Sequence, residues 1–482
     1  MARIDSAPEA ETAATIRERG ALGAVLLTIR AAAAQVVAFA GTLVLAHLLS
    51  PTTLGVVAFG TTVVTIGNFF ADGGLGAALI RRSSHPSTEE LQALLGLQLA
   101  LALVIGLGIA LVGSRTGQTG AVTAVMACSL PLLALRAPHA IALERALKYR
   151  PIASIEFTES LAFYGWAIVT VEAGWGVWGV ATAAVVRALA GSVLMTMASP
   201  LPLIGPRLRR GTLRSMLGFG IGFQAVGLAA LARQQGVNLV VVALGGERLL
   251  GYWSIANRLM QVPFWLFQAL WRVSYPTMAR LRAGGEDTRR MVVRFARVTA
   301  LASGAVLAPL AASAHYLVPA LFGANWAPAA APLPWASAGL IVSGPISVAA
   351  AGYLYSERNV RTPLIATIVN GAVWVAFTLI LLRPIGIAAV GIAWMLASWT
   401  EALVFSRALW RARVPVDKII LAPVGVAFVC ALGAYALRTP LAGPLADGIA
   451  SATVAAAAYL ALSLVFNRAD LLATIRRVRS LT

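Results

Sequence analysis

The sequence has few charged residues and almost no cysteine. Only 12% of its 482 residues are charged and 59% are hydrophobic, whereas soluble domains carry about 25% charged residues. The two cysteines, Cys128 and Cys430, lie in apolar segments without a CxxC or Cys/His cluster, which argues against a disulfide framework and a zinc site. Walker A, HExxH and GxSxG motifs are missing as well. We therefore expect no enzyme activity, no metal and no cofactor.

Acidic residues are scarce beside basic ones. The chain has 38 Lys and Arg against 19 Asp and Glu, a formal net charge of +19. Binding to nucleic acid would require a basic soluble domain, but apolar runs of about 20 residues, long enough to cross a bilayer, recur along nearly the whole chain. Long unbroken runs predict helices, because a membrane barrel needs strict alternation. The expected fold class is an all-α integral membrane protein with no nucleic-acid partner.

The apolar runs divide the chain into about fourteen transmembrane helices. They lie near 22–49, 54–80, 90–113, 118–142, 152–171, 176–198, 213–244, 249–276, 296–318, 330–355, 363–382, 386–406, 419–437 and 446–466. Alternate connections are rich in arginine, and both termini belong to the basic set. The positive-inside rule therefore predicts cytoplasmic N- and C-termini, and an even number of spans requires the same arrangement.

Short connections leave no domain outside the membrane, and a proline-rich basic segment divides the spans into two pseudo-symmetric lobes. The predicted organisation is a cytoplasmic segment at 1–21, an N-terminal transmembrane lobe at 22–198, a cytoplasmic basic linker at 199–212, a C-terminal transmembrane lobe at 213–406, and two additional helices with a cytoplasmic tail at 407–482. A weak repeat supports the two lobes, since Leu48, Leu54 and Gly55 recur about 196 residues later as Leu244, Leu250 and Gly251.

Charged residues inside the predicted spans are the first candidates for a functional site. Six are arginines: Arg30, Arg136, Arg187, Arg233, Arg258 and Arg272. Four are acidic: Asp72, Glu156, Glu159 and Glu401. A charge at the bilayer centre costs at least about 2.5 kcal/mol, so such side chains usually face a polar cavity, here of net positive charge. Because the guanidinium fork matches phosphate oxygens, we expect an anionic substrate carrying phosphate or pyrophosphate.

Two predicted spans carry a polar stripe on one helical face. In the eighth span the stripe has spacings of 4, 3, 4, 3 and 4 and comprises Ser254, Arg258, Gln261, Trp265, Gln268 and Arg272. It faces either a wet cavity or a neighbouring helix. The second span has a milder stripe of Thr61, Thr65, Asn68 and Asp72, and such residues also serve to hold helices together.

The remaining candidates differ in depth. Arg187 lies too deep in its predicted span to reach the interface easily. By contrast, Arg30, Arg136 and Arg233 face either the cavity or the interface near a helix end. Proton coupling and an interfacial helix end are both open for Glu156 and Glu159, near the start of the fifth span, and for Glu401.

Several short segments together resemble one family of membrane proteins. They are LLSPTTLG at 48–55, FADGGLGAALIRR at 70–82, ERALKYR at 144–150, LGYWSIANR at 250–258 and YPTMARL at 275–281. They resemble the polysaccharide and O-antigen flippases of the multidrug, oligosaccharidyl-lipid and polysaccharide exporter superfamily, over most of the chain but less after about residue 360. The resemblance implies two six-helix lobes around a central cavity, and alternating access. Related flippases line that cavity with arginines from the first and eighth helices, which supports Arg30 and Arg258.

One departure from the family concerns ion coupling. Family members often carry Asp just before the residue that matches Asn238, but Val237 stands there in this chain. Coupling to H⁺ or Na⁺ would then depend on Glu156, Glu159, Glu401, Asn238 and Asn370. The predicted substrate contacts are Arg258, Arg272, Arg187, Arg30, Arg136, Arg233, Gln261, Gln268, Asp72 and Asn68.

The resemblance implies a flippase for undecaprenyl-pyrophosphate-linked oligosaccharide, moved from the cytoplasmic to the outer leaflet of the bacterial inner membrane. The product would serve lipopolysaccharide or exopolysaccharide synthesis, with polymerase and glycosyltransferases as partners. One rival is a drug or cation antiporter of the same superfamily, although cationic drugs favour acidic cavities. Another rival is a polymerase or ligase, which normally needs a sizeable extracytoplasmic loop that this sequence lacks. A third is a membrane component of the assembly system that transports nothing.

Overall fold

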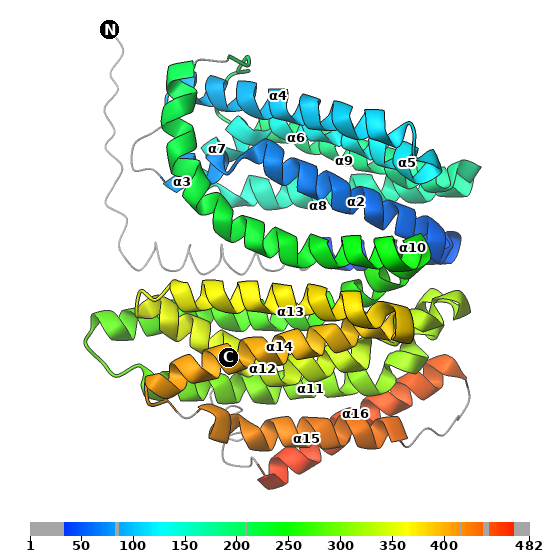
Figure 1. Ribbon diagram of the computed structural model, residues 1–482, viewed down its shortest axis with the longest axis vertical. Helices are drawn as coiled ribbons and strands as arrows, with labels where there is room; N and C mark the ends of the chain where they lie inside the picture. Colours follow the sequence, from blue (N-terminus) through cyan, green and yellow to red (C-terminus); the bar gives the residue numbers. More distant parts are fainter. Residues whose placement is uncertain (1–32, 82–85, 208–209, 415, 437–442, 467–482) are drawn as a thin grey trace, which may run out of the picture. The chain divides into compact units, whose positions relative to one another are not determined.

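The computed structural model describes residues 33–81, 86–207, 210–414, 416–436 and 443–466, and this part of the chain is helical throughout, without strands (Figure 1). The first described helix is Ala33–Leu48. It is followed by α2 Pro51–Asp72, α3 Leu75–Arg81, α4 Thr88–Gly113, α5 Gly117–Ala127, α6 Ser129–Leu135, α7 Ala137–Arg145, α8 Tyr149–Thr170, the π-helical turn η1 Val171–Trp175, α9 Val177–Ala198, α10 Arg210–Ala283, α11 Arg289–Phe322, the 3₁₀ segment η2 Ala324–Ala330, α12 Leu333–Ser356, α13 Arg361–Ile385, α14 Ala388–Arg411, α15 Val416–Ala436 and α16 Pro444–Phe466. The predicted all-α architecture is confirmed.

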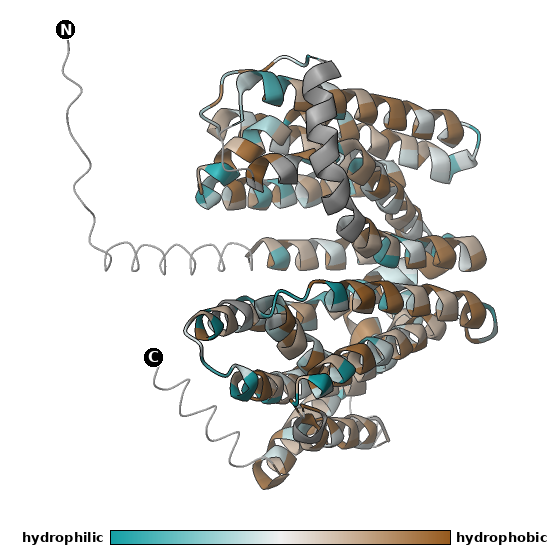
Figure 2. Ribbon diagram, turned by 60° about the vertical axis from the view of Figure 1, so that its left-hand side comes forward, coloured by the Kyte–Doolittle hydropathy of each residue, from teal (hydrophilic) through white to brown (hydrophobic). Residues whose placement is uncertain are grey.

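Many of the helices have the length and composition of membrane spans. Among the described residues, 10 helices are long and apolar enough to cross a bilayer. Figure 2 shows hydrophobic residues along the helices and hydrophilic residues near helix ends and connections. Large apolar side chains on α4, including Leu103, Val104, Leu107 and Leu111, are exposed. Exposure of such a stripe is costly in water but suits a helix that faces lipid.

Helix boundaries follow local sequence signals. α4 begins after Ser87, whose hydroxyl accepts a hydrogen bond from the Glu90 amide, while the Glu90 carboxylate accepts one from the Ser87 amide. This capping box satisfies amides that have no partner within the helix. α10 runs through two predicted spans and is interrupted at Gly246, which has φ 73° and ψ 179°. Glycine adopts this conformation without the steric cost that a side chain would bring.

One predicted span is broken in the structure. The sequence predicts a single helix near 118–142, but α5, α6 and α7 follow one another with interruptions at Cys128 and Arg136. Pro138 lies within the first turn of α7, where a missing amide proton costs little. The break leaves Arg136 between two short helices.

The chain forms two compact units, which are described separately. Unit 1 contains residues 1–48 and 63–223, and unit 2 contains residues 49–62 and 224–482. In unit 1, α4 packs against α5 and α6, and α9 packs against α6 and α8. In unit 2, α11 packs against α12, α15 and α16, and α14 packs against α12 and α13. The lobe boundaries predicted from the sequence, with a linker at 199–212, stay predictions.

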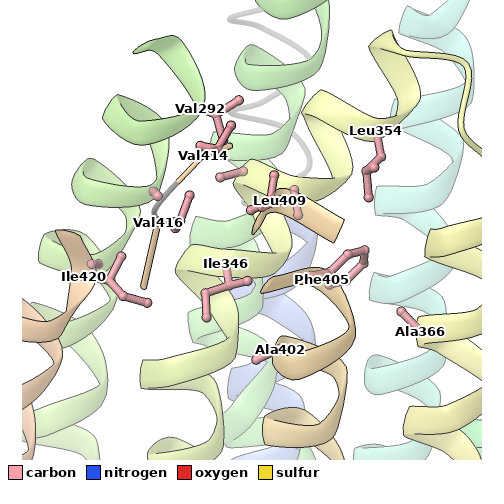
Figure 3. Close-up of a cluster of buried hydrophobic side chains, with 14 of the residues drawn as sticks. Val292, Ile346, Leu354, Ala366, Ala402, Phe405, Leu409, Val414, Val416 and Ile420 are labelled. Carbon is pink, nitrogen blue, oxygen red and sulfur yellow. The ribbon is translucent and has the colours of Figure 1, made fainter. Parts of the chain in front are cut away.

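A buried hydrophobic cluster in unit 2 joins α15 to the other helices of this unit. Figure 3 shows Ile346, Phe405, Leu409 and Val416 gathered from α12, α14 and the start of α15. These side chains belong to one buried cluster that also includes Val292 of α11. The contact places α15 against the bundle of unit 2.

The two segments of the weak repeat pack on one another within unit 2. A side chain on Gly55 would overlap the carbonyl oxygen of Glu247, and a side chain on Gly251 would overlap that of Pro51. The pairing is reciprocal and keeps the repeat's offset, since 251 − 55 = 196 and 247 − 51 = 196. Small residues of this kind let two membrane helices approach closely.

Candidate functional site

An ion cluster joins three helical segments of unit 1. Arg136 Nη1 is 2.6 Å from Glu159 Oε1, and Arg187 Nε is 3.6 Å from Glu159 Oε2. Glu159 lies midway along α8, a helix of 22 residues, and Arg187 lies midway along α9, also of 22 residues. Both therefore lie about 15 Å from either end of their helices, and α9 is one of the helices long and apolar enough to cross a bilayer.

The depth of Glu159 differs from its position in the sequence-based segmentation. That segmentation places Glu156 and Glu159 near the start of a span beginning at 152, but α8 begins at Tyr149 and Glu159 occupies its middle. The interpretation of Glu159 as an interfacial helix end is therefore wrong. Glu156 is exposed one turn earlier, within reach of the charges of Glu159, Arg136 and Arg187.

Arg136 reaches the cluster because the chain breaks between α6 and α7. At the end of α6 the carbonyl oxygen of Leu132 accepts a hydrogen bond from the Ser192 hydroxyl of α9, at 2.5 Å. A membrane helix cannot leave a carbonyl without a partner at this depth. Ser192 therefore supplies the partner and holds α6 against α9, so that Arg136 faces α8.

Gly191 provides the space for the Glu159 carboxylate. A Cβ atom at position 191 would overlap Glu159 Oε1 and also crowd its Cδ and Cγ atoms. The Glu159 side chain is only 5% exposed, whereas those of Arg136 and Arg187 are 31% and 53% exposed. The carboxylate thus lies behind the two guanidinium groups.

The close contact between Gly191 and the Glu159 carboxylate gives a testable expectation for Gly191→Ala. The added methyl group should push the carboxylate away from Arg136 and destabilise the protein by about 1–3 kcal/mol, as overpacking usually does. Thermal unfolding in detergent measures the effect. Gly165→Ala on α8, where a Cβ meets nothing within 4 Å, is the matched control. The penalty should vanish in a Glu159→Ala background, and a penalty that persists there would contradict this explanation.

Unit 2 contains a second buried polar chain, which links three candidates. Asn370 of α13 accepts a hydrogen bond through Oδ1 from Arg233 Nη1 at 3.3 Å, and donates one through Nδ2 to Glu401 Oε2 at 2.9 Å. Asn370 is buried. The charge of Arg233 also acts directly on Glu401. The sequence assigns Arg233 to the substrate and the other two residues to ion coupling, whereas the structure joins all three.

Asn238 belongs to a different group in unit 2. Its Oδ1 accepts a hydrogen bond from Trp253 Nε1 at 3.0 Å, and its Nδ2 donates to Thr62 Oγ1 at 3.1 Å. Trp253 also makes edge-to-face contacts with Trp374 and Trp394. Asn238 therefore has a clear packing role, and its proposed part in ion coupling stays a prediction.

The stripe on the second part of α10 is less buried toward its end. Arg258 and Gln261 are half-buried, whereas Gln268 and Arg272 are exposed. Ser254 donates a hydrogen bond to the Gly251 carbonyl oxygen at 2.7 Å, which is a bond within its own helix. The arginines of this stripe thus remain candidates for substrate contact.

On α2, Asp72 already has partners on both carboxylate oxygens. Oδ1 accepts from Gln98 Nε2 at 2.8 Å, and Oδ2 accepts from the Gly74 amide at 3.2 Å. These bonds hold the end of α2 against α4 within unit 1. Asn68 is exposed. The substrate roles of Asp72 and Asn68 stay predictions, and Arg30 lies outside the described residues.

Sequence reasoning missed four residues that shape these groups. Gly191 and Ser192 carry no charge, and Thr62 is a residue of a type that is common in membrane helices. Gln98 had a usable signal, because it is an amide side chain inside the apolar run 90–113, and it is buried in the structure. No group of three His, Cys, Asp or Glu residues suited to a metal ion occurs in the described ranges.

The fold is shared with solved membrane transporters. The lipid II flippase MurJ, in an inward closed conformation, matches with a TM-score of 0.75 over 93% of this chain and 100% of that chain, at 13% identity. An inward-facing multidrug resistance MATE family transporter of the MOP superfamily gives 0.58 over 82% and 98%, at 16% identity. A MATE transporter of Vibrio cholerae gives 0.50 over 80% and 95%, at 13% identity. The chain thus has the fold of MOP-superfamily flippases and transporters, which confirms the predicted class of multi-pass helical membrane protein.

The sequence also places the chain in a family. A family model described as polysaccharide biosynthesis protein matches residues 44–331, more than half of the chain. The chain therefore belongs to the polysaccharide biosynthesis protein family, as its motifs predicted. None of the curated proteins compared with it matches significantly. The family model thus describes polysaccharide biosynthesis, and the solved structures show the fold that the chain shares.

Proposed function

We propose that the protein is a flippase that moves undecaprenyl-pyrophosphate-linked oligosaccharide from the cytoplasmic to the outer leaflet of the bacterial inner membrane. The observation that carries this proposal is the half-exposed side chain of Arg187, 53% accessible at the middle of a 22-residue membrane helix. A guanidinium group at this depth cannot face lipid cheaply, so it requires a polar occupant such as water or an anionic head group. The family description, polysaccharide biosynthesis, supports a cargo that carries sugar.

The chemistry of arginine suits a pyrophosphate better than a sugar alone. A guanidinium group stays charged and donates two parallel hydrogen bonds to phosphate oxygens. Within unit 1 the candidate contact for the head group is Arg187, and within unit 2 the candidates are Arg258 and Arg272, while the polyprenyl tail would stay in lipid. Binding that differs between inward and outward states would then drive alternating access.

Orientation, coupling and partners complete the proposal. We place both termini in the cytoplasm because basic connections lie on that side. The chain of Arg233, Asn370 and Glu401 is a candidate for coupling to H⁺ or Na⁺. Glycosyltransferases would supply the lipid-linked sugar, and a polymerase would consume it for lipopolysaccharide or exopolysaccharide.

The second candidate is a drug or cation antiporter, which the MATE structures favour by fold. Arginine outnumbers acidic residues among the charged groups of the predicted spans, and a cationic drug would be repelled by an excess of positive charge. Deletion of the gene separates the two functions. We expect surface polysaccharide to disappear and lipid-linked oligosaccharide to accumulate in the membrane, with drug susceptibility unchanged. Normal polysaccharide together with increased drug susceptibility would reject the flippase.

A further inference from the structure

The ion cluster of unit 1 already holds a negative charge before any substrate arrives. Arg136 and Arg187 are positively charged, and the Glu159 carboxylate lies within ion-pair distance of both. Burying unpaired charge at the membrane centre is costly, so a resident carboxylate stabilises the empty site. The same carboxylate changes the energetics when a second anion enters.

Arg187 is held loosely compared with Arg136. Arg136 forms a 2.6 Å hydrogen bond with Glu159. Arg187 approaches the other oxygen only through Nε, at 3.6 Å, which exceeds hydrogen-bond distance. Its two terminal nitrogens make no hydrogen bond to another described residue, and the side chain is 53% exposed. The two terminal nitrogens of Arg187 can therefore donate hydrogen bonds to a ligand while its Nε atom faces the Glu159 carboxylate.

Glu159 cannot withdraw far from an arriving anion. Its side chain is almost fully buried, and the carboxylate lies directly against Gly191 of α9, where even a methyl group would overlap it. A phosphate bound to the Arg187 fork would therefore lie near a fixed negative charge. Like charges at close range in a protein interior repel strongly.

We infer that Glu159 is a resident counter-ion that competes with the substrate's phosphate groups for Arg136 and Arg187, and so limits affinity and promotes release. This inference rests on the proposed function and adds a role for Glu159 as a positioning residue. An arginine pair alone would hold a pyrophosphate tightly, which favours binding but slows turnover. With Glu159 present, the carboxylate regains Arg187 as the head group leaves, so the ion cluster forms again.

Equilibrium binding to the full-length protein in nanodiscs tests the inference, with undecaprenyl pyrophosphate as the probe and undecaprenol as its uncharged counterpart. Glu159→Gln keeps the side-chain size and removes the charge. We expect the Kd for the pyrophosphate to fall on the order of tenfold or more, the effect of removing one nearby like charge. Turnover should fall in the same variant, because release becomes slower. Binding of undecaprenol should not change.

Two further variants separate this role from a merely structural one. Glu172→Gln, at an exposed position in η1, is the matched control and should leave binding unchanged. The double variant Glu159→Gln with Arg136→Gln removes one charge of each sign, and should return the Kd toward that of the original protein. A structural role for the ion pair would not predict this rescue.

The outcomes distinguish the inference from the function on which it rests. If the original protein binds undecaprenyl pyrophosphate no better than undecaprenol, both are overturned. If it prefers the pyrophosphate but Glu159→Gln binds equally or more weakly, the proposed function stands and the counter-ion role is rejected. Tighter binding that the Arg136→Gln change does not reverse also rejects the counter-ion role.

Discussion

Replacing Arg187 and Arg258 together with alanine should reduce polysaccharide export to background while the protein stays in the membrane. Each charge-assisted hydrogen bond to a phosphate contributes about 1.5–3 kcal/mol. Loss of two arginines should therefore weaken head-group binding by roughly a hundredfold or more. Surface polysaccharide, normalised to the membrane level of the protein, measures the result.

The choice of Arg187 keeps the test free of a folding defect. Glu159 retains its short hydrogen bond with Arg136 when Arg187 is removed, so no buried carboxylate loses its last partner. Arg383→Ala, at the exposed end of α13, is the matched control and should leave export normal. Undiminished export by the double variant at equal protein level would reject the role of both arginines.

Gly251→Val should produce the largest loss of stability among the substitutions considered. The new side chain would overlap the backbone carbonyl oxygen of Pro51. Backbone atoms of a packed helix cannot rotate away as a side chain can, so we expect a cost of about 3 kcal/mol, at or above the upper end for overpacking. Melting temperature in detergent and yield in the membrane fraction measure the effect.

Gly425→Val provides the control for this prediction. Gly425 lies in α15, and a Cβ there meets nothing within 4 Å. Gly425→Val therefore replaces a helical glycine with the same side chain as Gly251→Val does, but without the overlap. Gly55→Val should resemble Gly251→Val, because Gly55 faces the Glu247 carbonyl oxygen. Equal stability of the variants at 251 and 425 would show that the crossing tolerates wider spacing than the structure implies.

Composition and apolar run length were sufficient to predict most of the helices. Lipid provides no partners for backbone groups, so an apolar run of about 20 residues has few alternatives to a helix. The break between the predicted spans 213–244 and 249–276, where Gly246 lies, was also predicted, because glycine and charged residues interrupt the apolar run there. The division of 118–142 into α5, α6 and α7 was not predicted, because its interruptions lie within an otherwise apolar run. Pro131 and Pro138 were the local signals that could have suggested it.

The candidate site was predicted less completely, for a physical reason. Helical spacing shows which residues share a face of one helix, but it does not show which faces meet. The sequence therefore identified Arg136, Arg187 and Glu159 separately, and the structure shows that one carboxylate contacts both arginines. In unit 1 Glu159 offsets part of the positive charge of the two arginines, and the net positive charge of the expected cavity stays a prediction. Asn370 likewise links Arg233 to Glu401.

Transbilayer movement in proteoliposomes tests the central claim most directly. The vesicles would contain undecaprenyl-pyrophosphate-linked oligosaccharide with a fluorescent label on the sugar, and a membrane-impermeant quencher would report label in the outer leaflet. We predict that the purified protein speeds equilibration between leaflets, and that the protein with Arg187→Ala and Arg258→Ala does not. Equilibration no faster than in protein-free vesicles, or equally fast with both arginines removed, would contradict the proposal.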